Sequence, residues 1–137
     1  MKRTKRIKPT ASVEYRLLVL PGYKEREDEF VTVVELQTAL EFSNFRYEIV
    51  VQDSVENNSL FLNIRGLHAP RSIMPAVGPA RFRKEYPVLS KVKRVTVTRI
   101  DGTENSFEVD ISRKQVVLKK SPKEQFVEFT VQEIQTQ

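Results

Sequence analysis

Apolar and polar side chains alternate with a period of two residues along most of this chain. Between residues 34 and 42, every even position except Thr38 is apolar, and Glu35, Gln37 and Glu41 stand between them. Successive side chains of a strand point to opposite faces, so this spacing predicts strands with one apolar face. Residues 30–42 also approach helical spacing, but the long alternation and the β-branched content favour a strand.

The same alternation recurs in short segments that turn residues separate. We expect strands at residues 13–20, 34–42, 45–52, 60–66, 92–100, 107–111, 116–118 and 126–134. Turns are expected at Pro21-Gly22, Ser43-Asn44, Asp53–Ser59, Asp101-Gly102, Arg113–Gln115 and Ser121-Pro122. We predict a hairpin of 34–42 with 45–52, a second hairpin at Asp101-Gly102, and an antiparallel meander over residues 92–134.

The charged run Glu25–Glu29 predicts a solvated loop. A calcium-binding loop is the alternative, but the run lacks the alternating ligands and the turn glycine of such a loop.

About seven to nine short strands and no expected helix are typical of an antiparallel β-sandwich, with a closed or partly open β-barrel as the main alternative. Two amphipathic sheets that face each other bury both apolar faces at once. A length of 137 residues suits one domain. We therefore expect a single domain over residues 13–137, preceded by a flexible basic tail over residues 1–12.

Residues 66–90 interrupt the alternation. Pro70, Pro75, Pro79 and Pro87 predict a long surface connection through which no helix or interior strand runs. Connections longer than about 12 to 15 residues are often binding loops, lids or linkers in compact domains. The segment is expected to be either a binding loop or a structural connection.

Charge is distributed unevenly along the chain, whose net charge is +5. The first ten residues carry five basic groups, and the rest balances 18 basic against 18 acidic groups. Residues 14–64 hold 4 basic and 10 acidic groups, whereas residues 65–99 hold 9 basic groups and only Glu85. Either an anionic partner binds the basic region, or the two regions face each other within the fold or across a self-association interface.

Basic and aromatic residues are interleaved at positions 81–86. Such cations can neutralise phosphates, and Phe82 and Tyr86 could stack on the bases of single-stranded nucleic acid. Alternatively, the rings anchor the segment to the core while the charges stay in water. The candidate binding residues of the basic region are Arg65, His68, Arg71, Arg81, Phe82, Arg83, Lys84 and Tyr86.

The sequence assigns no catalytic residue, metal ligand or cofactor. His68 is the only histidine, there is no cysteine, and neither a nucleophile-elbow motif nor a phosphate-loop motif occurs. An enzyme with a site near His68 therefore ranks behind two other hypotheses.

The first of these two hypotheses is a non-enzymatic interaction module or assembly component that contacts a protein partner or a second copy. The second is a nucleic-acid binder that uses the tail and residues 65–99. No segment reaches about 18 apolar residues, so no membrane span is expected. The lack of cysteine and of an apolar signal-peptide core predicts a cytoplasmic location.

Overall fold

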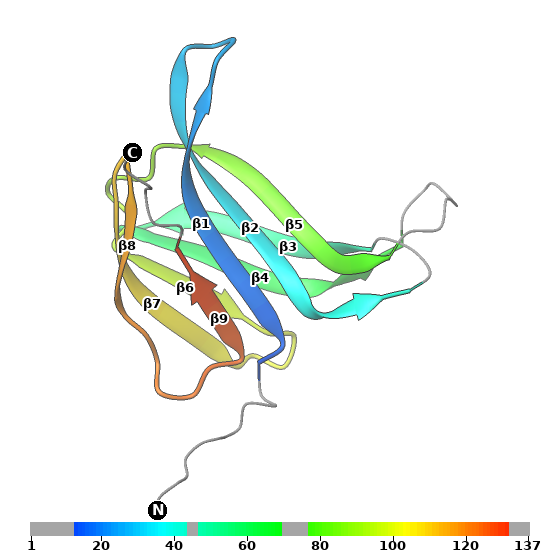
Figure 1. Cartoon of the computed structure of the whole chain (residues 1–137). Coiled ribbons are helices and arrows are strands. Elements are labelled where there is room, and N and C mark those ends of the chain that lie inside the picture. The colour runs from blue at the N-terminus through cyan, green and yellow to red at the C-terminus, as the bar shows by residue number, and fades with distance from the viewer. Residues whose placement is uncertain (1–12, 44–46, 70–76, 132–137) are drawn as a thin grey trace, which may run out of the picture.

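The computed structural model of the chain describes residues 13–43, 47–69 and 77–131 (Figure 1). The strands are β1 (Tyr15–Lys24), β2 (Glu29–Phe42), β3 (Glu48–Glu56), β4 (Ser59–His68), β5 (Gly78–Pro87), β6 (Arg94–Thr98), β7 (Glu104–Ile111), β8 (Val116–Lys120) and β9 (Val127–Thr130). The described residues form no helix, and so none that is long and apolar enough to cross a membrane. The all-β prediction is confirmed.

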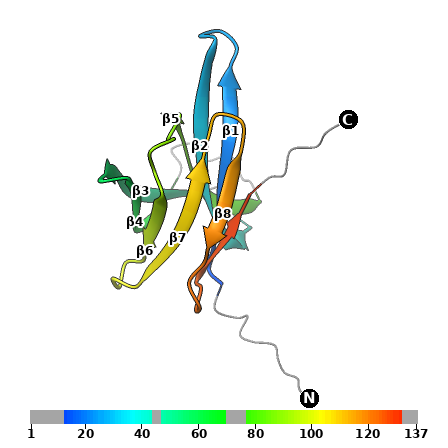
Figure 2. The same ribbon diagram turned by 90° about the vertical axis from the view of Figure 1, so that its left-hand side faces the viewer.

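The strands form one nine-stranded sheet in the order β8-β7-β6-β4-β3-β5-β2-β1-β9. The sheet curls until β8 approaches β1, which gives a nearly closed, barrel-like shape (Figure 2). A single residue pair, Glu48 with Arg81, joins β3 to β5. The nearly closed sheet corresponds to the barrel alternative of the predicted fold. Strands β1, β2, β5 and β9 face the other strands across the core (Figure 1).

The core is built from the apolar faces that the alternation predicts. Its fully buried side chains include Leu17 and Val19 of β1, Val34 and Leu36 of β2, Leu60 and Leu62 of β4, Val95 and Val97 of β6, and Phe107 of β7. Burial of one such side chain is worth about 1.5 to 3 kcal/mol relative to its exposure to water. Burial of these faces is the main stabilising contribution to the fold.

Asn105 fastens the connection between β8 and β9 to β7. Its buried amide oxygen accepts hydrogen bonds from the backbone nitrogens of Phe126 at 2.9 Å and Val127 at 3.1 Å. Its amide nitrogen donates to the carbonyl oxygens of Glu124 at 3.0 Å and Glu104 at 3.2 Å. This residue holds β9 in place to pair with β1.

Arg99 closes the same end of the barrel from the turn between β6 and β7. Its guanidinium carbon lies 4.6 Å from the centre of the Phe126 ring. Its terminal nitrogens pair with Glu14 at 2.8 Å and Asp101 at 3.3 Å. Arg99 thus connects the start of β1 with the start of β9.

The predicted turn at Pro21-Gly22 is wrong, because β1 continues through both residues. They pair with Thr32 and Val31 of β2. Among the described strands, β9 borders β1 only as far as Leu18, so the rest of that edge is free and tolerates a proline. At Gly22 a Cβ atom would lie 2.9 Å from Cγ2 of Val33, so the close approach of β2 requires glycine. The chain reverses at residues 25–28, within the predicted charged loop.

The predicted hairpin of residues 34–42 with 45–52 is also wrong. β2 pairs with β1 and β5, whereas β3 pairs with β4. β5 lies between β2 and β3 in the sheet, and this long-range pairing takes the place of the expected local one.

The prediction that no interior strand crosses residues 66–90 is wrong as well. β4 extends to His68, and β5 occupies Gly78–Pro87 between β3 and β2. Pro79 and Pro87 lie at the ends of β5, and β5 meets β3 only at Arg81, so few ladder bonds are needed on that side. Pro70 and Pro75 lie outside the described residues.

In the second half of the chain, the hairpin at Asp101-Gly102 and the next antiparallel pair of the predicted meander are confirmed, and one strand is misplaced. β6 and β7 are antiparallel neighbours on either side of Asp101-Gly102, and β7 pairs with β8. β9, however, leaves the predicted meander and pairs with β1 in parallel.

Earlier in the chain, the turn expected over Asp53–Ser59 is confined to Asn57 and Asn58. Their φ angles of 51° and 67° suit a tight hairpin turn.

Candidate functional site

Arg81 and Arg83 project from the outer face of β5, where both meet carboxylates. Nε of Arg81 lies 3.5 Å from Oε2 of Glu35 on β2. Nη1 of Arg83 lies 3.2 Å from Oε2 of Glu85. The charges of these two candidate residues are therefore partly satisfied within the chain.

Phe82 and Tyr86 point from β5 toward the core, whereas Lys84 is exposed. Phe82 packs against the core and Tyr86 is buried. The Tyr86 hydroxyl donates to Oδ2 of Asp53 at 2.7 Å, and Nζ of Lys84 donates to the same oxygen at 2.9 Å. Lys84 also lies over the Tyr86 ring, 5.1 Å from its centre. A buried Tyr86 ring cannot stack on a nucleic-acid base in this conformation.

The cluster of Asp53, Lys84 and Tyr86 bridges β3 and β5 beyond their single residue pair. Burial alone would raise the pKa of Asp53, but the hydrogen bonds from Tyr86 and Lys84 outweigh burial and hold that pKa below its ordinary value. Burial, together with the hydrogen bond to Asp53, raises the pKa of Tyr86. The shifts favour an ionised Asp53 beside a protonated Tyr86.

The other candidate residues do not join this cluster. Arg65 is exposed near the end of β4, and His68 is exposed at its last position, where it pairs with Glu48. Arg71 lies outside the described residues. Within the described ranges, no side chain makes a hydrogen bond or ion pair with His68, and no group of histidine and acidic residues could hold a metal ion.

A half-open groove of about 400 Å³ lies beside Arg65. Asn63, Ile64, Thr98 and residues of the β6–β7 turn complete its lining, and His68 is not part of it. The groove therefore gives no support to a site centred on His68.

The described basic residues of 65–99 come from β4, β5, β6 and the segments on either side of β6. Among the described residues, those of this region that pair with carboxylates are Arg81, Arg83, Lys84, Lys93 and Arg99. Three of the carboxylates, those of Glu14, Glu35 and Asp53, belong to the acidic region 14–64. The two oppositely charged regions therefore face each other within the fold.

The hairpin formed by the end of β1 and the start of β2 projects beyond the barrel (Figure 1). We call residues 22–30 the arm. Its pairs, such as Tyr23 with Phe30, have no further strand beside them among the described residues. The sequence did not predict this arm, because the turn expected at Pro21-Gly22 would have ended the strand there.

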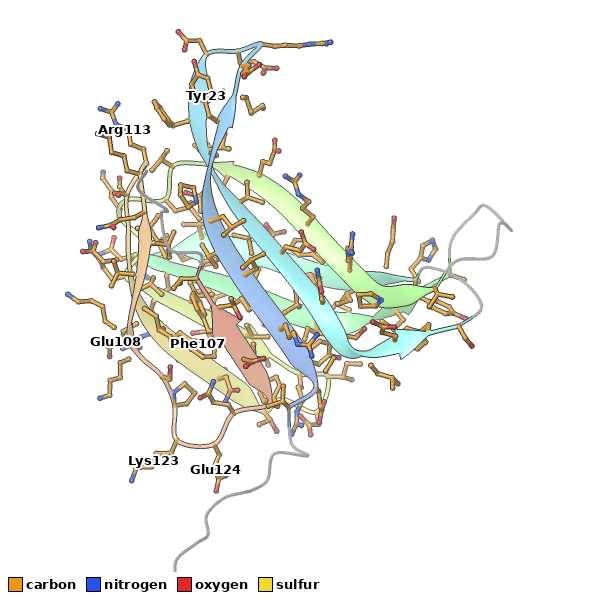
Figure 3. All side chains as sticks on the ribbon, viewed as in Figure 1. Tyr23, Phe107, Glu108, Arg113, Lys123 and Glu124 are labelled. Carbon is orange, nitrogen blue, oxygen red and sulfur yellow. The ribbon has the colours of Figure 1, made fainter. Side chains whose placement is uncertain are left out.

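Two aromatic rings lie together on the arm. Tyr23 is 48% exposed and Phe30 is 38% exposed, and their ring centres are 5.0 Å apart. The Tyr23 hydroxyl donates to Oδ1 of Asp28 at the tip, which raises the pKa of Tyr23. The guanidinium carbon of Arg113 lies 5.2 Å from the centre of the Phe30 ring and supports the arm at its base (Figure 3). In the sequence, the alternation of apolar and polar residues continues to Tyr23 on one side of the charged loop and to Phe30 on the other. This continuation was the one sequence signal for the arm.

Comparison of the chain with protein-family models, with curated proteins and with solved structures finds no match.

Proposed function

We propose that this protein is a non-enzymatic interaction module that contacts a protein partner through the arm. The exposed ring pair of Tyr23 and Phe30, held outside the core on a two-stranded ribbon, carries the proposal. Aromatic side chains often anchor protein interfaces, because they bury a large apolar area at a low cost in conformational entropy. We also propose that the protein is located in the cytoplasm.

The charge of the arm indicates what the partner offers. Residues 24–29 carry four carboxylates and two cations, and Lys24 is drawn toward Glu85 at 3.9 Å. Residues 24–29 of the arm therefore carry a net negative charge. A complementary partner has an apolar pocket for the rings and a basic rim around it.

The arm suits this role better than the basic and aromatic run at residues 81–86. In that run, Tyr86 is buried and the arginines meet Glu35 and Glu85. On the arm, the rings are exposed and lie outside the core cluster. An interface there buries new apolar area without disturbing the fold.

Site-specific photocrosslinking in cells that produce the protein tests the proposal. A photoreactive amino acid replaces Glu27 at the tip of the arm, and the matched control carries it at Glu108, an exposed position on β7. We expect discrete protein adducts from position 27 and not from position 108. Loss of two aromatic anchors costs about 2 kcal/mol or more, so the adducts should disappear in the double variant Tyr23→Ser/Phe30→Ser.

Adducts that are the same from both positions, or that persist without the two rings, would contradict the proposal. The double variant should melt near the temperature of the parent protein, because neither ring belongs to the core cluster. An adduct with a second copy of the chain would identify the partner as the protein itself.

A further inference from the structure

A second charged surface lies along β8 and the turns that flank it. The cationic strip consists of Arg113, Lys114, Lys119, Lys120 and Lys123, all of them exposed. Residues 113–123 contain no acidic residue. None of the five cations has a carboxylate within ion-pairing distance in the part of the chain that the structure describes, and Arg113 rests on the Phe30 ring.

The strip follows one edge of the sheet from end to end. β8 is the last strand in the sheet order, and within the described residues no strand pairs with its second edge. Figure 3 shows Arg113 and Lys123 at opposite ends of this edge. Five residues of strand span about 17 Å, which equals the rise of about five base pairs of B-form DNA.

Carboxylates near the strip are those of Glu108 and Asp110 on β7 and of Glu124, which follows Lys123 in the sequence. Asp110 is held by Nζ of Lys93 at 3.4 Å. Glu108 pairs with Lys120 in the ladder and is the one carboxylate of β7 directly opposite a strip cation. The strip therefore keeps an excess of positive charge over its length.

We propose that the cationic strip binds the phosphate backbone of a nucleic acid. Four of its five cations are lysines, which are depleted in protein–protein interfaces but commonly contact phosphates. Residues 113–123 include no aromatic residue, and the one large exposed apolar side chain there is Val117, which is 40% exposed. A folded protein partner or a membrane would find little apolar area on this edge, whereas phosphates need none.

The described chain begins near one end of the strip. The backbone nitrogen of Glu14 donates to the carbonyl oxygen of Phe126 at 2.8 Å, three residues after Lys123. The first ten residues, which carry five basic groups, lie outside the described residues. Their charge adds to the net positive charge of the chain, which attracts a polyanion.

Contacts of these cations with phosphates carry no sequence information, so binding is expected to be independent of sequence and strongly dependent on salt. Neutralisation of about four phosphates on a duplex lowers the affinity about 100-fold between about 50 and 200 mM salt. Lysines on an edge strand also hinder edge-to-edge pairing of copies. If the strip lysines served only to hinder such pairing, a variant without them would self-associate and would bind oligonucleotides as tightly as the parent.

Fluorescence anisotropy of the full chain with short labelled duplexes and single strands tests the proposal. The strip variant is Lys114→Gln/Lys119→Gln/Lys120→Gln/Lys123→Gln. The matched control is Arg26→Gln/Arg65→Gln/Lys91→Gln/Arg94→Gln, which removes the same charge at four exposed cations that have no carboxylate partner among the described residues. Three of these control positions belong to the basic region 65–99.

We expect the strip variant to lose affinity more than about 30-fold at about 50 mM salt and to lower the slope of log affinity against log salt by about 3 to 4. The control should lose less than about 3-fold. Sedimentation and thermal melting would show whether both variants keep the oligomeric state and the fold of the parent chain.

Three results would overturn the proposal. The first is an absence of saturable binding by the parent chain at about 50 mM salt, where phosphate contacts give their largest signal. The second is an equal loss in the strip variant and the control, which would indicate an effect of net charge alone. The third is tighter, strip-dependent binding to polyglutamate or to phosphatidylserine vesicles, which would identify an acidic protein or a membrane surface instead.

Discussion

Asp53 connects the two groups of strands where the sheet is weakest. β3 and β5 share one residue pair, and beyond it the side chain of Asp53, which is 18% exposed, receives hydrogen bonds from Tyr86 and Lys84. Hydrogen bonds to a charged group contribute about 1.5 to 3 kcal/mol each. This carboxylate is therefore expected to stabilise the junction of the two layers.

We expect Asp53→Asn to lower the free energy of unfolding by about 1 to 3 kcal/mol at neutral pH. The folded protein lowers the pKa of Asp53, so its contribution is present above the ordinary pKa of about 4 and is lost as the pH falls through the lowered value. Urea unfolding at neutral pH and at about pH 3 should show the difference between parent and variant shrink in acid. A difference that grows in acid would contradict this assignment, and Tyr86→Phe, which removes one hydrogen bond, should give a smaller effect.

Asn105 is the second residue on which the fold depends. Asn105→Ala removes the acceptor for the backbone nitrogens of Phe126 and Val127 and leaves both buried groups without a partner. We expect a loss of about 2 to 4 kcal/mol in the free energy of unfolding. The control is Ser106→Ala on the same strand, which breaks one side-chain contact of 2.9 Å with Thr96 and should cost about 1 kcal/mol or less. Equal effects of the two substitutions would argue against the role of Asn105 in holding β9.

At the scale of the element, the arm is separable from the barrel. Tyr23 and Phe30 lie outside the core cluster, and Gly22 and Val31 form a ladder pair at the base of the arm. Replacement of residues 23–30 by Asn-Gly creates a two-residue turn between paired positions, which suits a tight hairpin. We expect the shortened protein to fold with a melting temperature within about 5 °C of the parent. Failure to fold would show that the arm is part of the structural core.

The sequence was sufficient to predict most strands, because each strand signals itself by a local alternation of apolar and polar residues. The hairpin at Asp101-Gly102 was predictable for the same local reason. Pro21 and Pro79 were misread, since a strand tolerates proline where its neighbours leave an edge free or where it ends, and neighbours are a property of the sheet. The insertion of β5 between β2 and β3 and the parallel pairing of β9 with β1 depend on contacts distant in sequence, which no local pattern encodes.

At the scale of the whole molecule, the fold pairs much of the charge that the sequence separates. Contacts such as Glu35 with Arg81 and Glu14 with Arg99 join the acidic and basic regions. Exposed ion pairs contribute only about 0 to 1 kcal/mol each, so their main effect is to neutralise the region in which sequence analysis placed a binding surface. The arm and the cationic strip were not predicted as sites, because both depend on which strand edges the sheet order leaves free.

The position of β9 tests this account most directly, because pairing of β9 with β1 leaves the edge of β8 free. Nuclear Overhauser contacts between backbone protons of β9 and its neighbours distinguish the two arrangements. We expect contacts in parallel register between residues 15–18 and 127–130, for example between Leu17 and Phe129. Antiparallel contacts of residues 127–130 with β8, as a simple meander would give, would contradict the sheet order and cover the edge that carries the cationic strip.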